Sequence, residues 1–517
     1  MNKIKNKIRF SSVLILLLMM GCDSYVELEP RGEISSNYFN SEEEYEKALI
    51  GAYDMLQITF WNTLSATMAS DDIIAGGDPS NEDQPTLQRI DKMGQTQEDN
   101  NQLRDIWGFM YAGINRANYI LEFKDKTAFS GRDEIIAQAY FLRAYFTFEL
   151  AKWFGDIPLS TEKRDGVERI LNKRTFVGEE YTINRVGSIA AVYSLIEEDL
   201  KEAIVNLPES QVEKYEITKG AAQALLGKIY LYHGKFDNSK FSKAAVVFNQ
   251  VINSAKYQLA DYNVLFTPAG ENGVEAVFEI QYTNVEGASW ACIQCSEGNY
   301  MPKFNAPRDF SNATYMNGWG FSLPTQALFN AFKSGDKRRD VTILDLRGET
   351  TYALSRENTG FFTKKYLPTK IDEADRNGSD PLNFQNNYRS IRYADVLLMQ
   401  AEAVVQSGGA SGEVSLNKVR ARAFGNSSHD FPYNGESNLL DAIYAERRVE
   451  LAGEGHRFFD LVRTGRAKTA FDAYNSSKAS NANAINYVEN KNEIFPIPLV
   501  ELELANAVAR WGQNPGY

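Results

Sequence analysis

The fold is decided by residues 218–248, which read TKGAAQALLGKIYLYHGKFDNSKFSKAAVVF. Apolar residues recur at helical spacing in its first part, which predicts a helix over 218–232, and a second helix is predicted over 243–254. Gly227 has no side chain, so it lets two antiparallel helices approach closely, and Tyr230 is expected to pack into the gap. This stretch therefore predicts a packed helix pair.

The same stretch matches the small and aromatic positions of a tetratricopeptide unit. Gly227 and Tyr230 are followed by Gly234 and Phe236, and Ala244 and Phe248 keep the spacing of that unit after a five-residue insertion. Ala-rich helices predicted over 132–153 and 393–406 suggest further pairs. We therefore expect degenerate repeats that stack into a curved scaffold.

The rest of the chain is mainly helical, with an irregular stretch in the middle. Further helices are predicted over 42–58, 103–123, 188–207, 413–423 and 438–453. Residues 257–390 are rich in Gly, Asn, Pro and aromatic residues, and their periodicity is weak. They predict long loops with short strands, one of them over 275–282. The expected fold class is mainly α, with tetratricopeptide-like helix pairs and a loop-rich insertion.

The first 21 residues are typical of a signal peptide. Four basic residues precede a short apolar run over 13–20, which is too short to cross a hydrocarbon core of roughly 30 Å as a helix. Gly21-Cys22 closes this run as in a bacterial lipobox, so Cys22 is the expected lipidation site; a plain secretory signal is the alternative. No later stretch is long and apolar enough to span a bilayer, so the lipid would be the only anchor.

Besides Cys22, the chain has only Cys292 and Cys295. A single C-x-x-C can be a redox pair, half of a zinc site or a short-range disulfide. The three His are scattered, so a zinc site lacks ligands, and the surrounding loop lacks the βαβ context of a redox site. A disulfide that stiffens the loop and two idle thiols both remain open, and no cofactor is expected.

Sequence motifs of catalysis are absent, with one charged stretch left to explain. The chain has no G-x-S-x-G, H-E-x-x-H, P-loop or G-x-G-x-x-G motif. Residues 446–460 carry Glu446, Glu450, Glu454 and Asp460 among several arginines. An enzyme would use them as an acid/base cluster, but intermixed opposite charges favour mutual ion pairs that lock a helix junction.

The net charge and the aromatic content of the chain indicate which classes of ligand it can bind. The formal charge of −13 argues against general nucleic-acid binding. Aromatic residues make up 12% of the 517 residues, more than a core alone requires. Rings that the core does not need are candidates for flat recognition surfaces.

Five ordered blocks resemble the SusD/RagB family, and with the lipobox they span nearly the whole mature chain. They are FLRAYF to FGDIPL (141–159), GWG to DKRR (318–339), RYADVLLMQAEA (392–403), ERRVELAGEGHRFFDLVR (446–463) and FPIP to QNPGY (495–517). The resemblance implies a surface-exposed, lipid-anchored outer-membrane protein with no catalytic activity. Such proteins cap a SusC-like TonB-dependent transporter and present it with oligosaccharide or polysaccharide, whereas RagB-like relatives handle peptides.

The resemblance also implies where a glycan would bind, because ligand contacts in the family tend to come from two regions, here 61–89 and 290–321. Aromatic rings stack on the apolar faces of sugars, and polar side chains satisfy the hydroxyls. The candidate glycan-binding residues are Trp290, Tyr300, Trp61, Asp71, Asp72, Asn299 and Arg308. Trp319 lies inside a family block, so we expect it to pack rather than to touch ligand.

Two other functions remain open from sequence. A RagB-like protein would bind peptides, and an all-α glycoside hydrolase would need two carboxylates roughly 5–10 Å apart in one cleft. The predicted division of the chain is a signal peptide over 1–21, an N-terminal SusD-like region over 22–256 and a C-terminal region with the binding insertion over 257–517.

Overall fold

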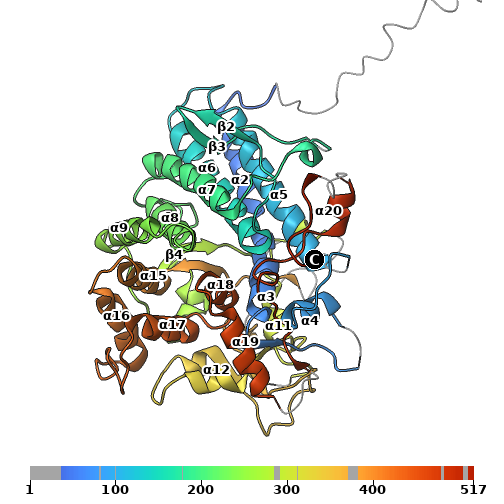
Figure 1. Ribbon diagram of the computed structural model, residues 1–517, viewed down its shortest axis with the longest axis vertical. Coiled ribbons are helices and arrows are strands. Elements are labelled where there is room, and N and C mark those ends of the chain that lie inside the picture. Colours follow the sequence, from blue (N-terminus) through green and yellow to red (C-terminus); the bar gives the residue numbers. More distant parts are fainter. Residues whose placement is uncertain are drawn as a thin grey trace, which may run out of the picture.

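The computed structural model describes residues 37–517 except 81–82, 99–100, 177, 285–291, 311, 371–381, 479–482 and 505–509. Helices dominate the described residues (Figure 1). The N-terminal half contains α2 (Glu42–Asp54), α3 (Phe60–Met68), α4 (Pro85–Asp91), α5 (Asn101–Glu122), α6 (Arg132–Phe154), α7 (Ile189–Asn206), α8 (Lys219–His233) and α9 (Ser239–Asn253). The C-terminal half contains α15 (Tyr393–Gln406), α16 (Gly412–Phe424), α17 (Leu439–Glu450), α18 (Arg457–Arg463), α19 (Ala467–Ser476) and α20 (Leu499–Leu504).

The helix positions follow from local sequence signals. The helix predicted over 393–406 is α15, with the same two ends. Ser188 and Thr218 precede α7 and α8, and their hydroxyl oxygens accept the free N–H groups of Ala191 and Ala221 in the first turn. The helix predicted over 42–58 is shorter, because the chain leaves α2 after Asp54 and turns through a 3-10 helix, η2 (Gln57–Thr59).

Successive helices pack side by side in a curved row. Each of α5, α6, α7, α8 and α9 contacts the next, and α15 and α16 continue the row beyond α9 (Figure 1). The predicted pair is α8 and α9: a Cβ atom on Gly227 would lie 2.5 Å from the Phe248 ring, so only glycine permits this approach. Tyr230 is buried. The mainly α fold with stacked helix pairs is confirmed.

The described strands form two-stranded antiparallel sheets in and around the loop-rich middle of the chain. Short helices α10 (Tyr262–Leu265), α11 (Met301–Asn305), α12 (Gln326–Ala331) and α13 (Arg339–Thr342) alternate with them. The pairs are β1 (Ile73–Ala75) with β5 (Ser322–Pro324), β4 (Ala276–Ile280) with β8 (Tyr388–Arg392), β6 (Ile343–Asp345) with β7 (Phe361–Thr363), and β2 (Thr161–Arg164) with β3 (Val167–Ile170). The strand predicted over 275–282 is β4.

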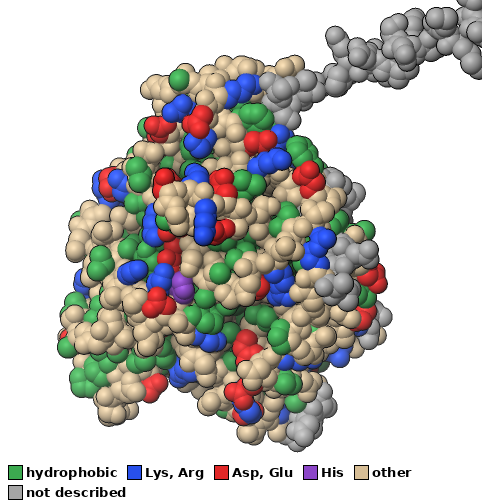
Figure 2. Space-filling model, turned by 45° about the horizontal axis from the view of Figure 1, so that its top comes forward, with side chains coloured by type: hydrophobic (Ala, Val, Ile, Leu, Met, Phe, Trp, Pro, Cys, Tyr) green, Lys and Arg blue, Asp and Glu red, His purple; other side chains and the backbone are tan. Residues whose placement is uncertain are grey.

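The largest hydrophobic core joins both halves of the chain, since its buried side chains range from Phe39 to Trp511. The division at residue 256 stays a prediction about the sequence. Among the described residues no helix is both long and apolar enough to cross a bilayer. On the face drawn in Figure 2, acidic and basic side chains are interspersed, without a continuous basic stripe.

Candidate ligand-binding surface

The β1–β5 ladder brings together the two regions that the sequence singles out. Ile73 pairs with Pro324 and Ala75 with Ser322. Beyond the strands the ladder continues, because Gly76 and Gly77 donate their N–H groups to the carbonyls of residues 321 and 320 at 2.8 and 3.0 Å. Regions 61–89 and 290–321, far apart in the sequence, therefore share one surface.

Glycine makes this close contact possible. A Cβ atom on Gly76 would lie 2.2 Å from the carbonyl oxygen of Gly320, and one on Gly77 would lie 2.7 Å from the ring of Phe321. Gly77 also has φ +88°, a conformation that residues with a side chain rarely adopt. Residues 352–356 lie beside the ladder, because Ala353 and Arg356 donate their N–H groups to the carbonyls of Arg308 and Gly77 at 2.8 and 3.0 Å. We call the surface formed by 76–78, Arg308, 315–321 and 352–356 the loop platform.

A charged pair lies on the loop platform. Arg308 donates through Nη2 to Asp78 Oδ2 at 2.9 Å, and the two side chains are 21% and 26% exposed. The Nε atom of Arg308 is buried without a hydrogen-bond partner. Hydrogen bonds from the hydroxyl and backbone N–H of Ser80, with Arg308 adding to them, hold the pKa of Asp78 below its usual range. The platform thus offers a fixed carboxylate and a fixed guanidinium to a ligand.

Trp319 stands out among the described tryptophans, because the other four are buried and it is half-buried. Its ring meets Phe304 edge-on, with centroids 4.9 Å apart and planes at 84°, and its backbone N–H donates to Lys303 at 2.8 Å. The ring therefore has a fixed orientation and remains partly open to solvent. Trp319 packs against the hydrophobic core, as the sequence argument expects, and is in addition partly exposed.

Three of the predicted glycan-binding residues are in the interior. Trp61 is 3% exposed and packs against Phe60 and Phe304, and Tyr300 and Asn299 are fully buried. The Tyr300 hydroxyl donates to Ser296 at 2.5 Å. A buried ring has no free face for a sugar, so the predictions for Trp61, Tyr300 and Asn299 are wrong in this structure.

The predictions for Asp71 and Asp72 are also wrong, because arginines occupy both carboxylates. Arg457 donates to Asp71 at 2.8 Å, and Arg448 donates to Asp72 at 3.0 Å. Both aspartates are buried. These pairs attach the turn before β1 to α17 and α18, and the carboxylates are not available to a ligand. Of the predicted residues, Arg308 alone lies on the loop platform, and Trp290 and Cys22 fall outside the described residues.

The carboxylates of the charged stretch 446–460 are ion-paired, as the structural interpretation predicts, but most of their partners lie outside the stretch. Arg447 pairs with Asp460, whereas Arg448 and Arg457 bind Asp72 and Asp71. Glu450 and Glu454 are fully buried. Glu450 accepts hydrogen bonds from Arg338 at 2.8 Å and from Arg392 and Arg422 at 2.5 Å. Acid/base catalysis needs a carboxyl group that is free to exchange a proton, and a glutamate held by three guanidinium groups is not.

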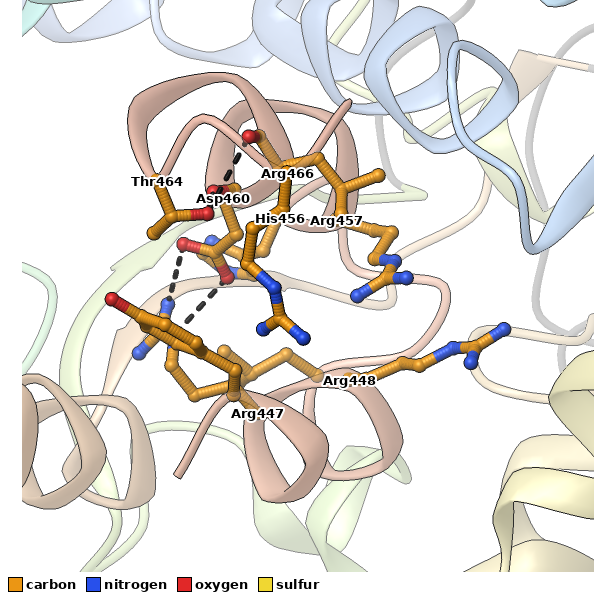
Figure 3. Close-up of a pocket in the computed structure, with 10 residues that line it drawn as sticks. Arg447, Arg448, His456, Arg457, Asp460, Thr464 and Arg466 are labelled. Atoms are coloured by element: carbon orange, nitrogen blue, oxygen red, sulfur yellow. Dashed lines mark hydrogen bonds and ion pairs between the residues drawn. The ribbon is translucent and has the colours of Figure 1, made fainter. Parts of the chain in front are cut away.

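Figure 3 shows the neighbouring pocket, where Asp460 faces Arg447 while Arg448 and Arg457 extend away from it. Arg447 Nε lies 3.0 Å from Asp460 Oδ2. Burial, with Lys228 adding to it, lowers the pKa of His456 to about 3, so its ring is neutral at physiological pH. The pocket volume is about 10 Å³, room for no more than about one water. It is a helix junction rather than a substrate cleft.

Cys292 and Cys295 form a disulfide around the short 3-10 helix η5 (Ile293–Cys295). This decides between the two alternatives that the sequence left open. Within the described ranges no group of three or more His, Cys, Asp and Glu side chains is arranged to hold a metal ion.

Comparison with known proteins agrees with this architecture. Two family models match the chain, the SusD family over residues 342–517 and "Starch-binding associating with outer membrane" over residues 24–231. SusD-like protein P2 of Formosa agariphila is 27% identical over 99% of this chain and its own full length. Surface glycan-binding protein A from Bacteroides fluxus is 27% identical, with a TM-score of 0.79 over 92% of this chain and all of its own. A laminarin-binding SusD-like protein is 32% identical, with a TM-score of 0.77 over 93% of this chain and 100% of its own. The chain therefore belongs to the SusD family.

Proposed function

We propose that this protein is a non-enzymatic glycan-binding lipoprotein of the outer membrane. It captures oligosaccharide or polysaccharide and delivers it to a SusC-like TonB-dependent transporter. The observation that carries the proposal is the 32% identity to a laminarin-binding protein over nearly the whole length of both chains. Laminarin is therefore the first glycan to test.

The loop platform is the proposed glycan site. Trp319 supplies a fixed, partly exposed ring for the apolar face of a sugar, and Asp78 and Arg308 supply acceptors and donors for its hydroxyls. Because these groups are already held in place, binding orders few side chains and loses little affinity to that ordering. Trp290, on the same stretch of chain as the disulfide, remains a proposed second contact.

The proposed location rests on the lipobox and on the family description, which associates its members with the outer membrane. Acylation of Cys22 would tether the protein, with the binding face toward the exterior. Cys22→Ser should move the protein from the membrane fraction to the soluble fraction. If the Cys22→Ser variant stays with the membrane, the proposed anchor is wrong.

The binding test is affinity electrophoresis of the protein from residue 23 onward, through gels cast with laminarin and other polysaccharides. Laminarin should retard the protein, and Trp319→Ala should abolish the retardation while the circular dichroism spectrum is unchanged. Phe236→Ala is the matched control, because Phe236 is an exposed ring (51%) outside the loop platform. Retardation that survives Trp319→Ala but not Trp290→Ala would move the site along the loop. No retardation by any glycan, with binding of oligopeptides, would replace the glycan by a peptide.

A further inference from the structure

A second candidate site lies on the tetratricopeptide-like half and shares no lining residue with the loop platform. A cavity of about 350 Å³ opens between α5, the segment that follows β3, and the C-terminal residues that include Glu501 and Trp511. Figure 1 shows α5 beside α20 and the C-terminus. The volume is at the lower end of the range of about 300–1,000 Å³ that is typical of small-molecule sites.

Four aromatic rings line this cavity, and they are near neighbours. Trp107 lies 5.0 Å from Tyr111 and 6.1 Å from Trp511 between ring centroids, and Tyr181 lies 6.5 Å from Trp511. Two rings are fixed by hydrogen bonds: the Tyr111 hydroxyl donates to the Pro158 carbonyl at 3.0 Å, and Trp511 Nε1 donates to the Ile183 carbonyl at 2.7 Å. The aromatic walls are therefore preorganised.

The charge of the lining limits the kind of ligand. Among the described lining residues there is no Lys, Arg or His, and Glu501 is the one ionisable acid. Asn115 offers an oriented polar side chain to a ligand, because its Oδ1 accepts the Thr175 N–H at 2.8 Å and this fixes the amide plane. Arg185 lies behind the lining, where its Nη1 donates to the Trp511 carbonyl at 3.3 Å, so an anion in the cavity would find no cation among the lining side chains and would be buried at a cost of several kcal/mol.

We propose that this cavity binds a small uncharged molecule with one or two aromatic rings. Its rings would stack against Tyr111 and Tyr181, the two lining rings that are only partly buried, and a polar substituent would reach the Asn115 amide. The proposal does not depend on glycan binding at the loop platform, because the two sites use different residues.

The test uses a pair of fluorescent probes that differ by one charge. N-phenyl-1-naphthylamine is uncharged, and 8-anilinonaphthalene-1-sulfonate is the same ring system with a sulfonate. The uncharged probe should bind saturably at one site per protein, at least about tenfold more tightly than the sulfonate. Equal affinity for the two probes would overturn the proposed ligand class.

Two matched glycine variants test whether the uncharged probe binds in this cavity. Gly108 lines the cavity and Gly51 lies on α2, and a Cβ atom at either position meets nothing within 4 Å. Leucine at either position should therefore be tolerated by the fold, and it should also improve helix propensity. Gly108→Leu fills the mouth of the cavity and should weaken probe binding at least about tenfold, whereas Gly51→Leu should leave it unchanged. Unchanged binding in Gly108→Leu, or an equal loss in both variants, would overturn the proposed site.

Discussion

Replacing Glu450 by Gln tests whether the buried charge network holds the C-terminal half together. Glu450 is fully buried and accepts hydrogen bonds from Arg338, Arg392 and Arg422. Gln has nearly the same shape but no charge, so the variant leaves three guanidinium groups with less negative charge around them. The packing of apolar side chains should be unchanged, but the NH2 group of Gln cannot accept from the arginines, so the variant tests the charge and the hydrogen bonds of the network together.

The expected loss is about 3–5 kcal/mol of unfolding free energy, the range for removing one partner from a buried ion pair. The loss should depend on pH. Burial opposes ionisation of Glu450, but Arg422, Arg392 and Arg338 outweigh it and hold its pKa well below 4.5. A depressed pKa contributes stability that is present above about pH 4.5 and is lost as the pH falls toward the folded-state pKa. The difference between wild type and variant should therefore shrink in acid.

The assay is equilibrium unfolding in guanidinium chloride at pH 7 and at pH 4, followed by tryptophan fluorescence and circular dichroism. The matched control is Glu43→Gln, since Glu43 is also paired, with Lys47 at 2.7 Å, but is 73% exposed. The control should unfold at the wild-type midpoint, because exposed pairs contribute little. A Glu450→Gln midpoint equal to that of the control at pH 7 would refute the reasoning.

Two further predictions concern single sites. Gly227→Ala should destabilise the protein by about 1–3 kcal/mol, because the new Cβ atom would lie 2.5 Å from the Phe248 ring. Gly51 lies in open space on α2, so Gly51→Ala should stabilise the protein by up to about 1 kcal/mol. The thermal unfolding midpoints of the two variants should therefore shift in opposite directions. Burial raises the pKa of Asp91, which accepts the Ala75 N–H at 3.0 Å, to about 6. Because the folded state holds the proton more tightly than the unfolded state, the unfolding free energy falls as the pH rises from about 4 to about 6. Over this interval wild type should lose up to about 3 kcal/mol of unfolding free energy relative to Asp91→Asn. Parallel pH profiles for the two proteins would contradict this.

The helices could be predicted because their signals are local. The periodicity of 393–406 fixes both ends of α15, and the lack of a side chain at Gly227 predicts the close contact between α8 and α9. That the glutamates in 446–460 are ion-paired was also predictable from the intermixed charges, but their partners were not. Glu450 binds Arg338, Arg392 and Arg422, and none of these lies in that stretch.

The individual site residues could not be predicted, because their environment depends on distant parts of the chain. Arg448 and Arg457, the partners of Asp72 and Asp71, lie 376 and 386 residues further along. Trp61 is buried because α11 supplies Phe304 against it. Sequence patterns located the two regions that form the loop platform, but they could not distinguish a buried ring from an exposed one.

The β1–β5 ladder has a consequence for when the protein becomes able to bind. Asp78 and Arg308 are 230 residues apart, so a ribosome that adds about 5–20 residues per second makes Arg308 roughly 10–50 s after Asp78, and the charged pair cannot form earlier. The platform needs the chain through residue 356, so a chain cut short before β5 would lack one edge of the platform and bind nothing there.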